Sequence, residues 1–403
     1  MRVLHVIPSL SPRHGGPSKA LPVMAQGLIE AGVEVDVVTT DDDGPGQRLT
    51  AMPLGEWAPR DGWRVMHFAK QTEFYKVSWP LWSWLLRHAR DYDLIHVHAV
   101  FSFSTLAAGW AARLAGVPFV VRPLGTLNAW GMKNRRRWVK SLSFRLLDKP
   151  VLDRAAAVHF TSEQEAEEAF SLKLRARAAL SPLGMDLVPF TQLPPAADFA
   201  KLWPETQGRT LILYLSRLDP IKKLDHLIAA TSRIRSQHPD ALLVIAGAGE
   251  KELERALRQQ VQDLGMTDSV LWTGMLDHTA KLAAFSAATL FVLPSLSENF
   301  GIALLEAMAA GLPCIASSGV ALAHQVPGAV MMVPPNVDAL AEAIHDLLID
   351  LDRRQSLAKE ARRRAFADFS AEARGLAVRQ LYEDILAGAP FTAQLSSPTP
   401  PSL

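Results

Sequence analysis

The sequence SENFGIALLEAMAAGLP, at residues 297–313, decides the fold more than any other stretch of this chain. An apolar run at residues 290–293 precedes it and ends at Pro294, which is typical of a buried strand in a parallel sheet. Glu298 follows at the expected strand-to-helix turn, and Glu306 lies about two turns into the helix. Open α/β sheets bind ligands beyond the carboxyl ends of their strands, so this stretch predicts a ligand site.

The same residues suit a phosphorylated ligand that is rich in hydroxyl groups. Backbone N–H groups near Phe300 and Gly301, at the helix start, can meet negative oxygens. Glu298 and Glu306 can accept hydrogen bonds from sugar hydroxyls, and Glu306 interrupts a mostly apolar helix face, where a carboxylate needs a partner. Acidic pairs at such spacing are also common on solvated surface helices, so the rest of the chain must decide between the two interpretations.

The composition describes a soluble globular protein that is long enough for two domains. The chain has 403 residues, of which 49% are hydrophobic and 21% charged. A formal charge of +1 does not favour nucleic acid as the main partner. The single cysteine, Cys314, excludes an internal disulfide and fits a reducing compartment. Residues 1–8 are too short for a signal peptide, so we expect a cytoplasmic protein.

Strand and helix patterns alternate in two series along the chain, which predicts two α/β domains with parallel sheets. The first domain is expected at residues 1–185 and the second at 209–370, with their strand ends facing a common cleft. Four prolines punctuate residues 186–208, which we expect to be an interdomain linker. A helix at 371–388 is expected to pack back on the first domain. The tail at 389–403 is rich in Pro, Ser and Thr, and we expect it to be disordered.

Further motifs follow the predicted strands of the second domain. Arg217 and Lys222 lie in the sequence SRLDPIK at 216–222, and two cations near a helix start suit a diphosphate. A dinucleotide dehydrogenase is disfavoured because PSL at residues 8–10 replaces the glycine-rich turn expected after the first strand. The next two strands of the second domain are followed by short glycine turns, which alone are weak evidence: Gly247, Gly249 and Gly274.

Taken together, these motifs resemble the family 4 retaining glycosyltransferases, of the type found in bacterial surface-polysaccharide biosynthesis. The resemblance extends from the first predicted strand to the last helix. It implies the GT-B fold, with two Rossmann-like domains, and a metal-independent hexosyltransferase that needs no cofactor. It also implies a nucleotide-diphosphate sugar as donor and a glycan or lipid-linked acceptor. The residues that carry the resemblance are Gly15, Gly16, His98, Arg217, Lys222, Glu298, Asn299, Phe300, Gly301 and Glu306.

The resemblance also implies roles for these residues. Arg217 and Lys222 would bind the donor diphosphate and stabilise its charge as it leaves, and Glu298 would lie near the hydroxyls of the transferred sugar. His98 would support the developing oxocarbenium charge, and Glu306 would hold the nucleotide ribose. The remaining donor-binding residues would be Gly15, Gly16, Gly247, Gly249, Gly274, Asn299, Phe300 and Gly301.

The chain departs from the family pattern at a few positions. Ser216 and Lys223 stand where glycine is common in the family. After Gly319 the usual second glycine and the downstream glutamate are missing, which puts the details of that loop in doubt. We expect no metal site. His96 and His98 share one face of a strand, but a third ligand at matching spacing is lacking.

The acceptor side is expected in the first domain. Arg122 and Gly125 follow one of its strands, in a segment similar to those of transferases that build surface polysaccharides. Residues 133–149 hold seven basic residues against one acid, interleaved with apolar residues. Such a stretch lies on an anionic membrane surface or packs as an ordinary surface helix. We expect the first of these, at the inner face of the plasma membrane, with a polyprenyl-diphosphate-linked acceptor. Three upstream residues would join the same face: Trp79, Trp82 and Trp84.

Three alternative functions stay open at this point. The chain could be a GT-B sugar-nucleotide 2-epimerase, or a synthase of a storage glucan or a disaccharide. An epimerase should carry additional carboxylates and histidines for proton chemistry, and no such set is evident. A non-catalytic subunit that binds a nucleotide sugar is the third alternative. The joint presence of Arg217, Lys222, Glu298 and Glu306 argues against it.

Overall fold

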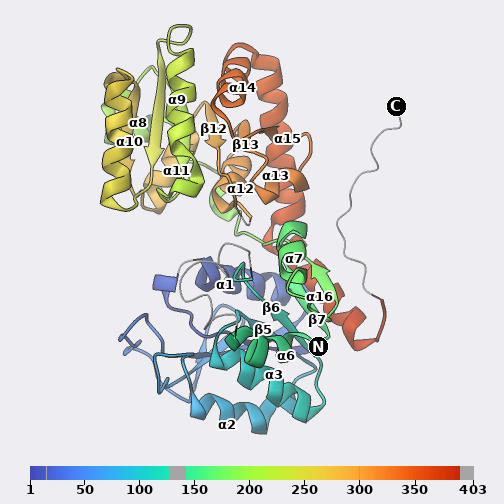
Figure 1. The fold of residues 1–403 in the computed structure, drawn as a ribbon. Coiled ribbons are helices and arrows are strands. Elements are labelled where there is room, and N and C mark those ends of the chain that lie inside the picture. The colour runs from blue at the N-terminus through green and yellow to red at the C-terminus, as the bar shows by residue number, and fades with distance from the viewer. Residues whose placement is uncertain (15, 128–141, 299, 391–403) are drawn as a thin grey trace. The chain divides into compact units, whose positions relative to one another are not determined.

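Figure 1 shows the computed structural model of the chain, which describes residues 1–390 apart from 15, 128–141 and 299. The chain forms two compact units. Unit 1 comprises Met1–Met185 together with Phe369–Leu403, and unit 2 comprises Asp186–Asp368. Each unit is built on a parallel sheet flanked by helices, as the alternating pattern predicts. The tail predicted to be disordered lies largely outside the described residues.

Unit 1 contains an eight-stranded sheet in the order β3-β4-β2-β1-β5-β6-β7-β8. All neighbouring strands are parallel except β3, which is antiparallel to β4 at the edge. From β1 the chain builds one half of the sheet and then returns to start the other half at β5. The strands are β1 (Arg2–Val6), β2 (Glu34–Thr40), β3 (Trp57–Pro59), β4 (Arg64–Phe68), β5 (Leu94–His98), β6 (Phe119–Arg122), β7 (Ala157–Phe160) and β8 (Ala178–Leu180).

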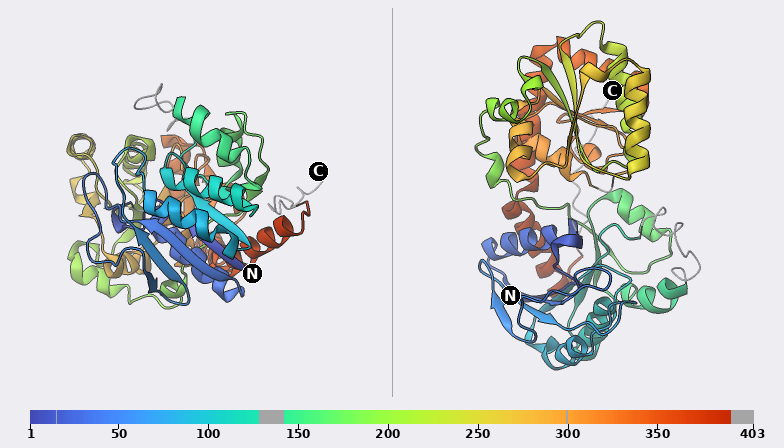
Figure 2. Two further views of the ribbon diagram at one scale, coloured as in Figure 1. Left: turned by 90° about the horizontal axis from the view of Figure 1, so that it is seen from below. Right: turned by 90° about the vertical axis from the view of Figure 1, so that its left-hand side faces the viewer.

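Helices cover both faces of this sheet. Side chains of α2 and α3 pack into the hydrophobic core on one face, and side chains of α1 and α16 pack into the core on the other (Figure 1). The two layers are also visible in Figure 2. The helices are α1 (Gly16–Glu30), α2 (Trp79–His88), α3 (Phe103–Ala115), the π-helix η3 (Phe144–Asp148), α6 (Lys149–Leu152), α7 (Glu163–Phe170) and α16 (Ala371–Leu386).

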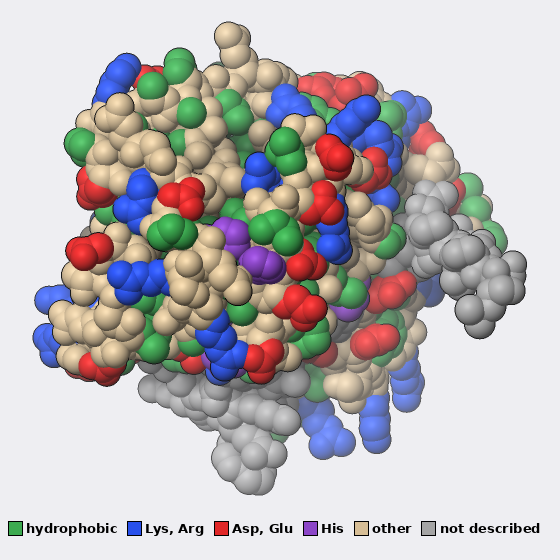
Figure 3. Space-filling model, turned by 90° about the horizontal axis from the view of Figure 1, so that it is seen from above, with side chains coloured by type: hydrophobic (Ala, Val, Ile, Leu, Met, Phe, Trp, Pro, Cys, Tyr) green, Lys and Arg blue, Asp and Glu red, His purple; other side chains and the backbone are tan. Residues whose placement is uncertain are grey.

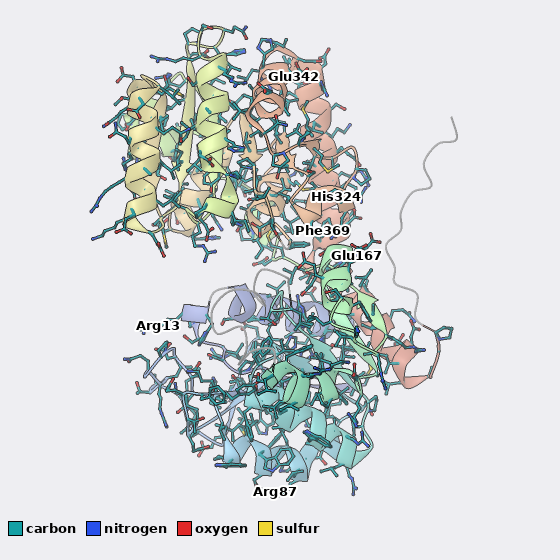
Figure 4. All side chains as sticks on the ribbon, viewed as in Figure 1. Arg13, Arg87, Glu167, His324, Glu342 and Phe369 are labelled. Carbon is teal, nitrogen blue, oxygen red and sulfur yellow. The ribbon has the colours of Figure 1, made fainter. Side chains whose placement is uncertain are left out.

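The C-terminal helix α16 returns to unit 1 and packs closely on α1. A Cβ atom on Gly375 would lie 2.0 Å from the carbonyl oxygen of Gly27, and a Cβ on Gly27 would lie 2.0 Å from that of Ala371. Only glycine allows this approach of two backbones. The chain passes into α16 just after Phe369, which is labelled in Figure 4. The close contact therefore fixes the C-terminal helix on the first unit.

Substitution of Gly375 by alanine should lower the free energy of unfolding by about 1–3 kcal/mol, because the new methyl group meets backbone and forces the helices apart. This loss outweighs the gain of about 1 kcal/mol in helix propensity that alanine brings over glycine. Chemical denaturation measures the effect. The neighbouring Leu376 is half exposed, so Leu376→Ala should change the free energy by less than about 1 kcal/mol. Equal stabilities of Gly375→Ala and the unmodified chain would contradict the backbone contact.

Unit 2 contains a six-stranded sheet in the order β11-β10-β9-β12-β13-β14, and all its neighbouring strands are parallel. The order reverses between β9 and β12, as in the dinucleotide-binding folds. The strands are β9 (Thr210–Leu215), β10 (Ala241–Ala246), β11 (Val270–Gly274), β12 (Leu290–Leu293), β13 (Cys314–Ser317) and β14 (Met331–Val333).

Helices flank the sheet of unit 2 on both faces, as the right view of Figure 2 shows. On one face, α9, α10 and α14 contribute to a single hydrophobic core with the strands. The helices are α8 (Ala197–Leu202), α9 (Leu224–Ile234), α10 (Lys251–Asp263), α11 (His278–Ala287), α12 (Ile302–Ala309), α13 (Ala321–Gln325), α14 (Val337–Ile349) and α15 (Leu351–Phe369).

The linker predicted at 186–208 is instead an integral part of unit 2. Its helix α8 packs against α11, and Phe199 of α8 is fully buried. The carbonyl oxygen of Pro194 accepts a hydrogen bond from the Ser286 hydroxyl at 2.6 Å. The linker prediction was wrong because the prolines lie in or beside short helical turns, and Phe190 and Phe199 of this segment are buried in unit 2.

The charged surface is mixed in sign on the face shown in Figure 3, where basic and acidic side chains are interspersed. Within the described part of the chain, every helix is too short or too polar to cross a membrane.

Candidate active site

The reversal of strand order in unit 2 brings two loops together at one edge of the sheet. Strand β9 lies between β10 and β12, and the chain leaves it in one direction before it returns to form β12. The loops after β9 and β12 therefore flank the same point, which is where open α/β sheets bind ligands. Between these loops, the Leu296 N–H donates to the Ile221 carbonyl at 2.8 Å.

A cation and a carboxylate from the two loops meet at this point. Lys222 ends the short 3-10 helix η6 (Pro220–Lys222), which Asp219 caps by accepting a hydrogen bond from the Ile221 N–H at 3.1 Å. The Lys222 ammonium group forms an ion pair with the Glu298 carboxylate. Lys222 is buried and Glu298 is only partly exposed. The ion pair satisfies a buried charge, and it fixes the Lys222 ammonium group at the strand end where an anionic ligand would bind.

Lys223 has a strained backbone, which explains why glycine is common at its position in the family pattern. Its φ angle is +53°, in the left-handed region that favours glycine. The residue stands at the junction between η6 and α9, where the chain turns after Lys222. A left-handed residue here is needed to place Lys222 at the end of one helix and begin the next.

The loop after β12 leads into α12 through Gly301, whose φ angle is +101°. The first amide groups of α12 have no partner within the helix, so its N-terminus suits a negative group. Asn299 lies outside the described residues, and the adjacent Phe300 is buried. A donor-binding role for these residues is consistent with their position and stays a prediction.

Gly319 lies in a third loop, which follows β13 and packs against the loop that carries Leu296 and Glu298. The Glu298 N–H donates to the Gly319 carbonyl at 2.8 Å. A Cβ on Gly319 would lie 2.3 Å from the Leu296 carbonyl oxygen. The loop that departs from the family pattern thus still packs on the backbone beside Glu298, and its glycine is required by that contact.

The predicted glycine turns hold the neighbouring loops together in the same unit. A Cβ on Gly247 would lie 1.9 Å from the Ser216 carbonyl, and a Cβ on Gly249 would lie 2.2 Å from that of Leu218. The Gly247 N–H donates to the Gly274 carbonyl at 2.8 Å. These glycines are therefore explained by close packing of the loops after β9, β10 and β11, and their contact with a donor stays a prediction.

Arg217 lies on the same loop as Lys222 but has a different environment. Its side chain is 73% exposed, and one guanidinium nitrogen lies 3.3 Å from an Asp219 carboxylate oxygen. A surface ion pair of this kind is weak. Arg217 is thus free to turn towards a ligand, whereas Lys222 is held in place.

Glu306 has a partner that the sequence pattern did not reveal. It lies in the middle of α12, and its carboxylate forms an ion pair with the Lys281 ammonium group of α11. The Glu306 side chain is 12% exposed and that of Lys281 is 22% exposed. Lys281 was missed because it lies 25 positions earlier in the chain, on a helix with no distinctive motif. The ion pair orients the carboxylate that the resemblance assigns to the ribose.

Replacement of Lys281 by methionine should weaken nucleotide binding about tenfold, because the Glu306 carboxylate loses the charged partner that orients it. Lys281→Arg should restore most of the affinity. The dissociation constant is measured by isothermal titration. The ligand is the nucleoside diphosphate that raises the thermal stability of the chain most. An unchanged dissociation constant in Lys281→Met, with Glu306→Ala impaired, would show that Glu306 acts without this partner.

The predicted site residues of unit 1 are placed at the strand ends of that unit. Gly16 begins α1, and Gly15 lies outside the described residues. Gly125 has a φ angle of +72°, and its N–H donates to a Glu165 carboxylate oxygen at 2.7 Å. His98 ends β5 and Arg122 ends β6, and both are only 1% exposed. Their roles at the sugar and the acceptor stay predictions.

His98 and Arg122 belong to a buried polar cluster between the sheet and helices α1 and α16. His5 and His98 are hydrogen-bonded to each other at 2.9 Å, and His96 is hydrogen-bonded to the Tyr382 hydroxyl of α16 at 2.6 Å. In the described part of the chain, Nε and Nη2 of Arg122 have no hydrogen-bond partner. The cluster therefore joins the C-terminal helix to the sheet through polar groups.

Three of these imidazoles lie close enough to share a metal ion. His5, His96 and His98 offer ligand atoms within 4.8 Å of one another. The sequence pattern showed no third ligand at matching spacing, because His5 comes from a separate strand, β1, and reaches His96 only by pairing in register with it. The charge of the buried Arg122 guanidinium opposes a cation at this place.

Burial holds these histidines in their neutral form. Burial, with a smaller contribution from the Arg122 charge, lowers the pKa of His5 and of His159 to about 3. Burial and the neighbouring positive groups also lower the pKa values of His96 and His98 well below the ordinary value. A histidine in an unfolded chain has a pKa near 6.5. The unfolded state therefore takes up protons below that pH, while the folded state does not.

The free energy of unfolding should fall by about 3 kcal/mol between pH 7.5 and pH 5.5 through His5 and His159 alone. A histidine whose pKa is lower in the folded chain than in the unfolded chain contributes stability above the pKa of the unfolded chain. That contribution is lost as the pH falls below this value. Urea denaturation of the full chain at both pH values measures the change. His159→Gln should reduce the fall by about 1.4 kcal/mol. The control is His278→Gln, at an exposed histidine, which should leave the fall in the free energy of unfolding unchanged. A free energy of unfolding that does not depend on pH would contradict the neutral, buried state of His5 and His159.

Comparisons with known proteins agree with this geometry. The family model "Glycosyl transferase 4-like domain" matches residues 15–184, and "Glycosyl transferases group 1" matches residues 198–364. Glycogen synthase of Mycobacterium tuberculosis is 36% identical over 191 residues, which are 46% of this chain and 44% of that protein. The chain thus spans less than half the length of this relative. GDP-mannose:cellobiosyl-diphosphopolyprenol alpha-mannosyltransferase of Xanthomonas oryzae is 26% identical over 87% of this chain and 88% of its own.

Solved structures with low sequence identity share the fold. Sucrose-phosphate synthase from Thermosynechococcus elongatus has a TM-score of 0.70 and 24% identity, over 96% of this chain and 100% of its own. HepE of Anabaena, solved in complex with UDP, has a TM-score of 0.72 and 18% identity, over 95% of this chain and 100% of its own. With the two parallel sheets described above, these likenesses confirm the GT-B fold class predicted from the sequence.

Proposed function

We propose that this chain, a glycosyltransferase whose two halves match the 4-like and group 1 family models, is a retaining, metal-independent hexosyltransferase. It transfers a sugar from a nucleotide-diphosphate sugar to a glycan or a lipid-linked acceptor and needs no cofactor. The observation that carries the proposal is the Lys222–Glu298 ion pair at the reversal of strand order. It places a fixed cation beside the N-terminus of α12, where a diphosphate would be held.

The chemistry follows from what these residues offer. In retention by same-face attack, the bond from the anomeric carbon to the leaving phosphate oxygen breaks as the bond to the acceptor oxygen forms. The leaving phosphate oxygen takes the proton of the acceptor hydroxyl. The protein then has to position both substrates and stabilise the charge on the diphosphate. Lys222 and Arg217 supply that stabilisation, and a side-chain nucleophile is not required.

The acceptor is proposed to be linked to a polyprenyl diphosphate, in a cytoplasmic enzyme at the inner face of the plasma membrane. The Xanthomonas relative that matches most of this chain acts on cellobiosyl-diphosphopolyprenol by its name. The basic stretch predicted to touch the membrane, 133–149, lies mostly outside the described residues. A glucan synthase is the second candidate, which the likeness of one half of the chain to glycogen synthase favours.

Lys222→Ala should lower kcat at least about 100-fold, because it removes a fixed charge from the leaving group. Arg217→Ala should act in the same direction. Thermal-shift screening against UDP-, GDP- and ADP-sugars first identifies the donor, since a bound ligand raises the apparent stability. Release of the nucleoside diphosphate in the presence of acceptor then measures turnover.

The control for this experiment is Lys359→Ala, which removes an exposed lysine of α15 far along the chain from these loops. It should leave kcat unchanged. Unchanged turnover in both Lys222→Ala and Arg217→Ala would contradict the proposal that these two residues stabilise the leaving diphosphate. Transfer from a nucleotide sugar to a glucan primer, without transfer to a polyprenyl-linked acceptor, would favour the glucan synthase.

A further inference from the structure

Unit 1 exposes large apolar side chains on the face of the sheet opposite α1 and α16. Trp79 of α2 is 60% exposed, and Trp110 and Leu114 of α3 are 43% and 64% exposed. Leu146 of η3 is 63% exposed. Single exposed apolar residues are ordinary, but a gathering of this kind on one face marks an interaction site.

The helices that carry these side chains pack side by side. The rings of Trp79 and Phe103 meet edge to face at a centroid distance of 5.5 Å, which joins the start of α2 to the start of α3. On the other side of α3, a Cβ on Gly109 would lie 2.4 Å from a Val151 methyl group of α6, so α3 also packs closely on η3 and α6. The left view of Figure 2 shows these elements from below. We name this surface, formed by α2, α3 and η3, the α2–α3 face.

The structure changes the set of residues that the sequence assigned to such a face. Trp82 and Trp84 were expected there together with Trp79. Instead, both pack against the buried core of unit 1, and the Trp84 ring meets Trp57 at 5.8 Å. Trp110 takes their place, and it comes from a helix that the sequence pattern did not implicate.

The charged residues of α2 and α3 are all basic. The sequences of α2 and α3 contain no acidic residue, and both helices are fully described. Arg87 projects from the outer side of α2, as labelled in Figure 4, and Arg113 of α3 stacks over the Trp110 ring at 5.9 Å. Arg145 of η3 is exposed beside Leu146. Exposed tryptophan, leucine and arginine together are the composition of a surface that lies in the headgroup layer of an anionic membrane.

We propose that the α2–α3 face docks the protein on an anionic lipid bilayer. Trp79, Trp110 and Leu114 enter the boundary between headgroups and acyl chains, and the arginines pair with lipid phosphates. The inference deepens the proposed function, because an acceptor on a polyprenyl lipid is presented at that surface. The sequence prediction named residues 133–149 with Trp79, Trp82 and Trp84. The α2–α3 face shares Trp79, Arg145 and Leu146 with that prediction, and it adds Trp110 and Leu114 of α3.

Flotation of the full chain with vesicles tests the proposal. The protein should float with vesicles of phosphatidylcholine and phosphatidylglycerol, and less so in high salt. It should not float with phosphatidylcholine alone. Trp79→Ala combined with Trp110→Ala should lower the bound fraction at least about tenfold, and Arg87→Glu combined with Arg113→Glu should act similarly. Matched controls are Ile349→Ala combined with Leu351→Ala, and Lys359→Glu, all at exposed positions of unit 2.

Three further measurements, of folding, nucleotide affinity and oligomeric state, separate the possible causes of a loss of flotation. Circular dichroism and thermal unfolding show whether the variants are folded, and the arginine variant serves if the tryptophan variant is not. Nucleotide affinity reports on the proposed function separately, and it should be unchanged in every variant. Equal flotation of the folded variants and the unmodified chain would overturn the proposal. So would a dimer that Trp79→Ala and Trp110→Ala convert to a monomer, because the face would then belong to a second copy.

Discussion

The reversal of strand order between β9 and β12 is the constraint on which the second unit depends. Neighbouring parallel strands can be joined only by long crossovers, so the chain must leave β9 on one side and return on the other. At the reversal, the loops after β9 and β12 flank the same point of the sheet edge, where open α/β sheets bind ligands. Lys222 and Glu298 meet there across 76 residues of sequence, and the N-terminus of α12 lies on the same loop as Glu298.

Close backbone contacts at glycine hold the elements that surround this point. Gly247 and Gly319 each allow one loop to rest on the carbonyl oxygens of another, and Gly375 does the same for two helices of unit 1. A side chain at any of these positions would separate the two backbones. The loops that carry the charged residues are therefore positioned by main-chain packing, which tolerates little change, while Arg217 on the same loop stays exposed.

Unit 1 shows how the two faces of one sheet can differ. One face carries buried neutral histidines and a buried arginine, which Tyr382 joins to the C-terminal helix. The depressed histidine pKa values reduce the stability of the folded chain at low pH. The other face packs through apolar side chains and leaves tryptophan and leucine on its outer surface. The predicted acceptor residue Arg122 ends strand β6 of this sheet.

The sequence by itself determined the two α/β units, the family and the position of the Lys222 and Glu298 loops, because strand periodicity and turn residues are local properties. It also marked Lys223 as a departure, which the left-handed backbone explains. Only the tertiary structure supplied Lys281 beside Glu306, and His5 beside His96, since each pair joins separate elements. It also placed residues 186–208 within unit 2 and turned Trp82 and Trp84 inward. Burial depends on which elements pack together, and no local pattern encodes that choice.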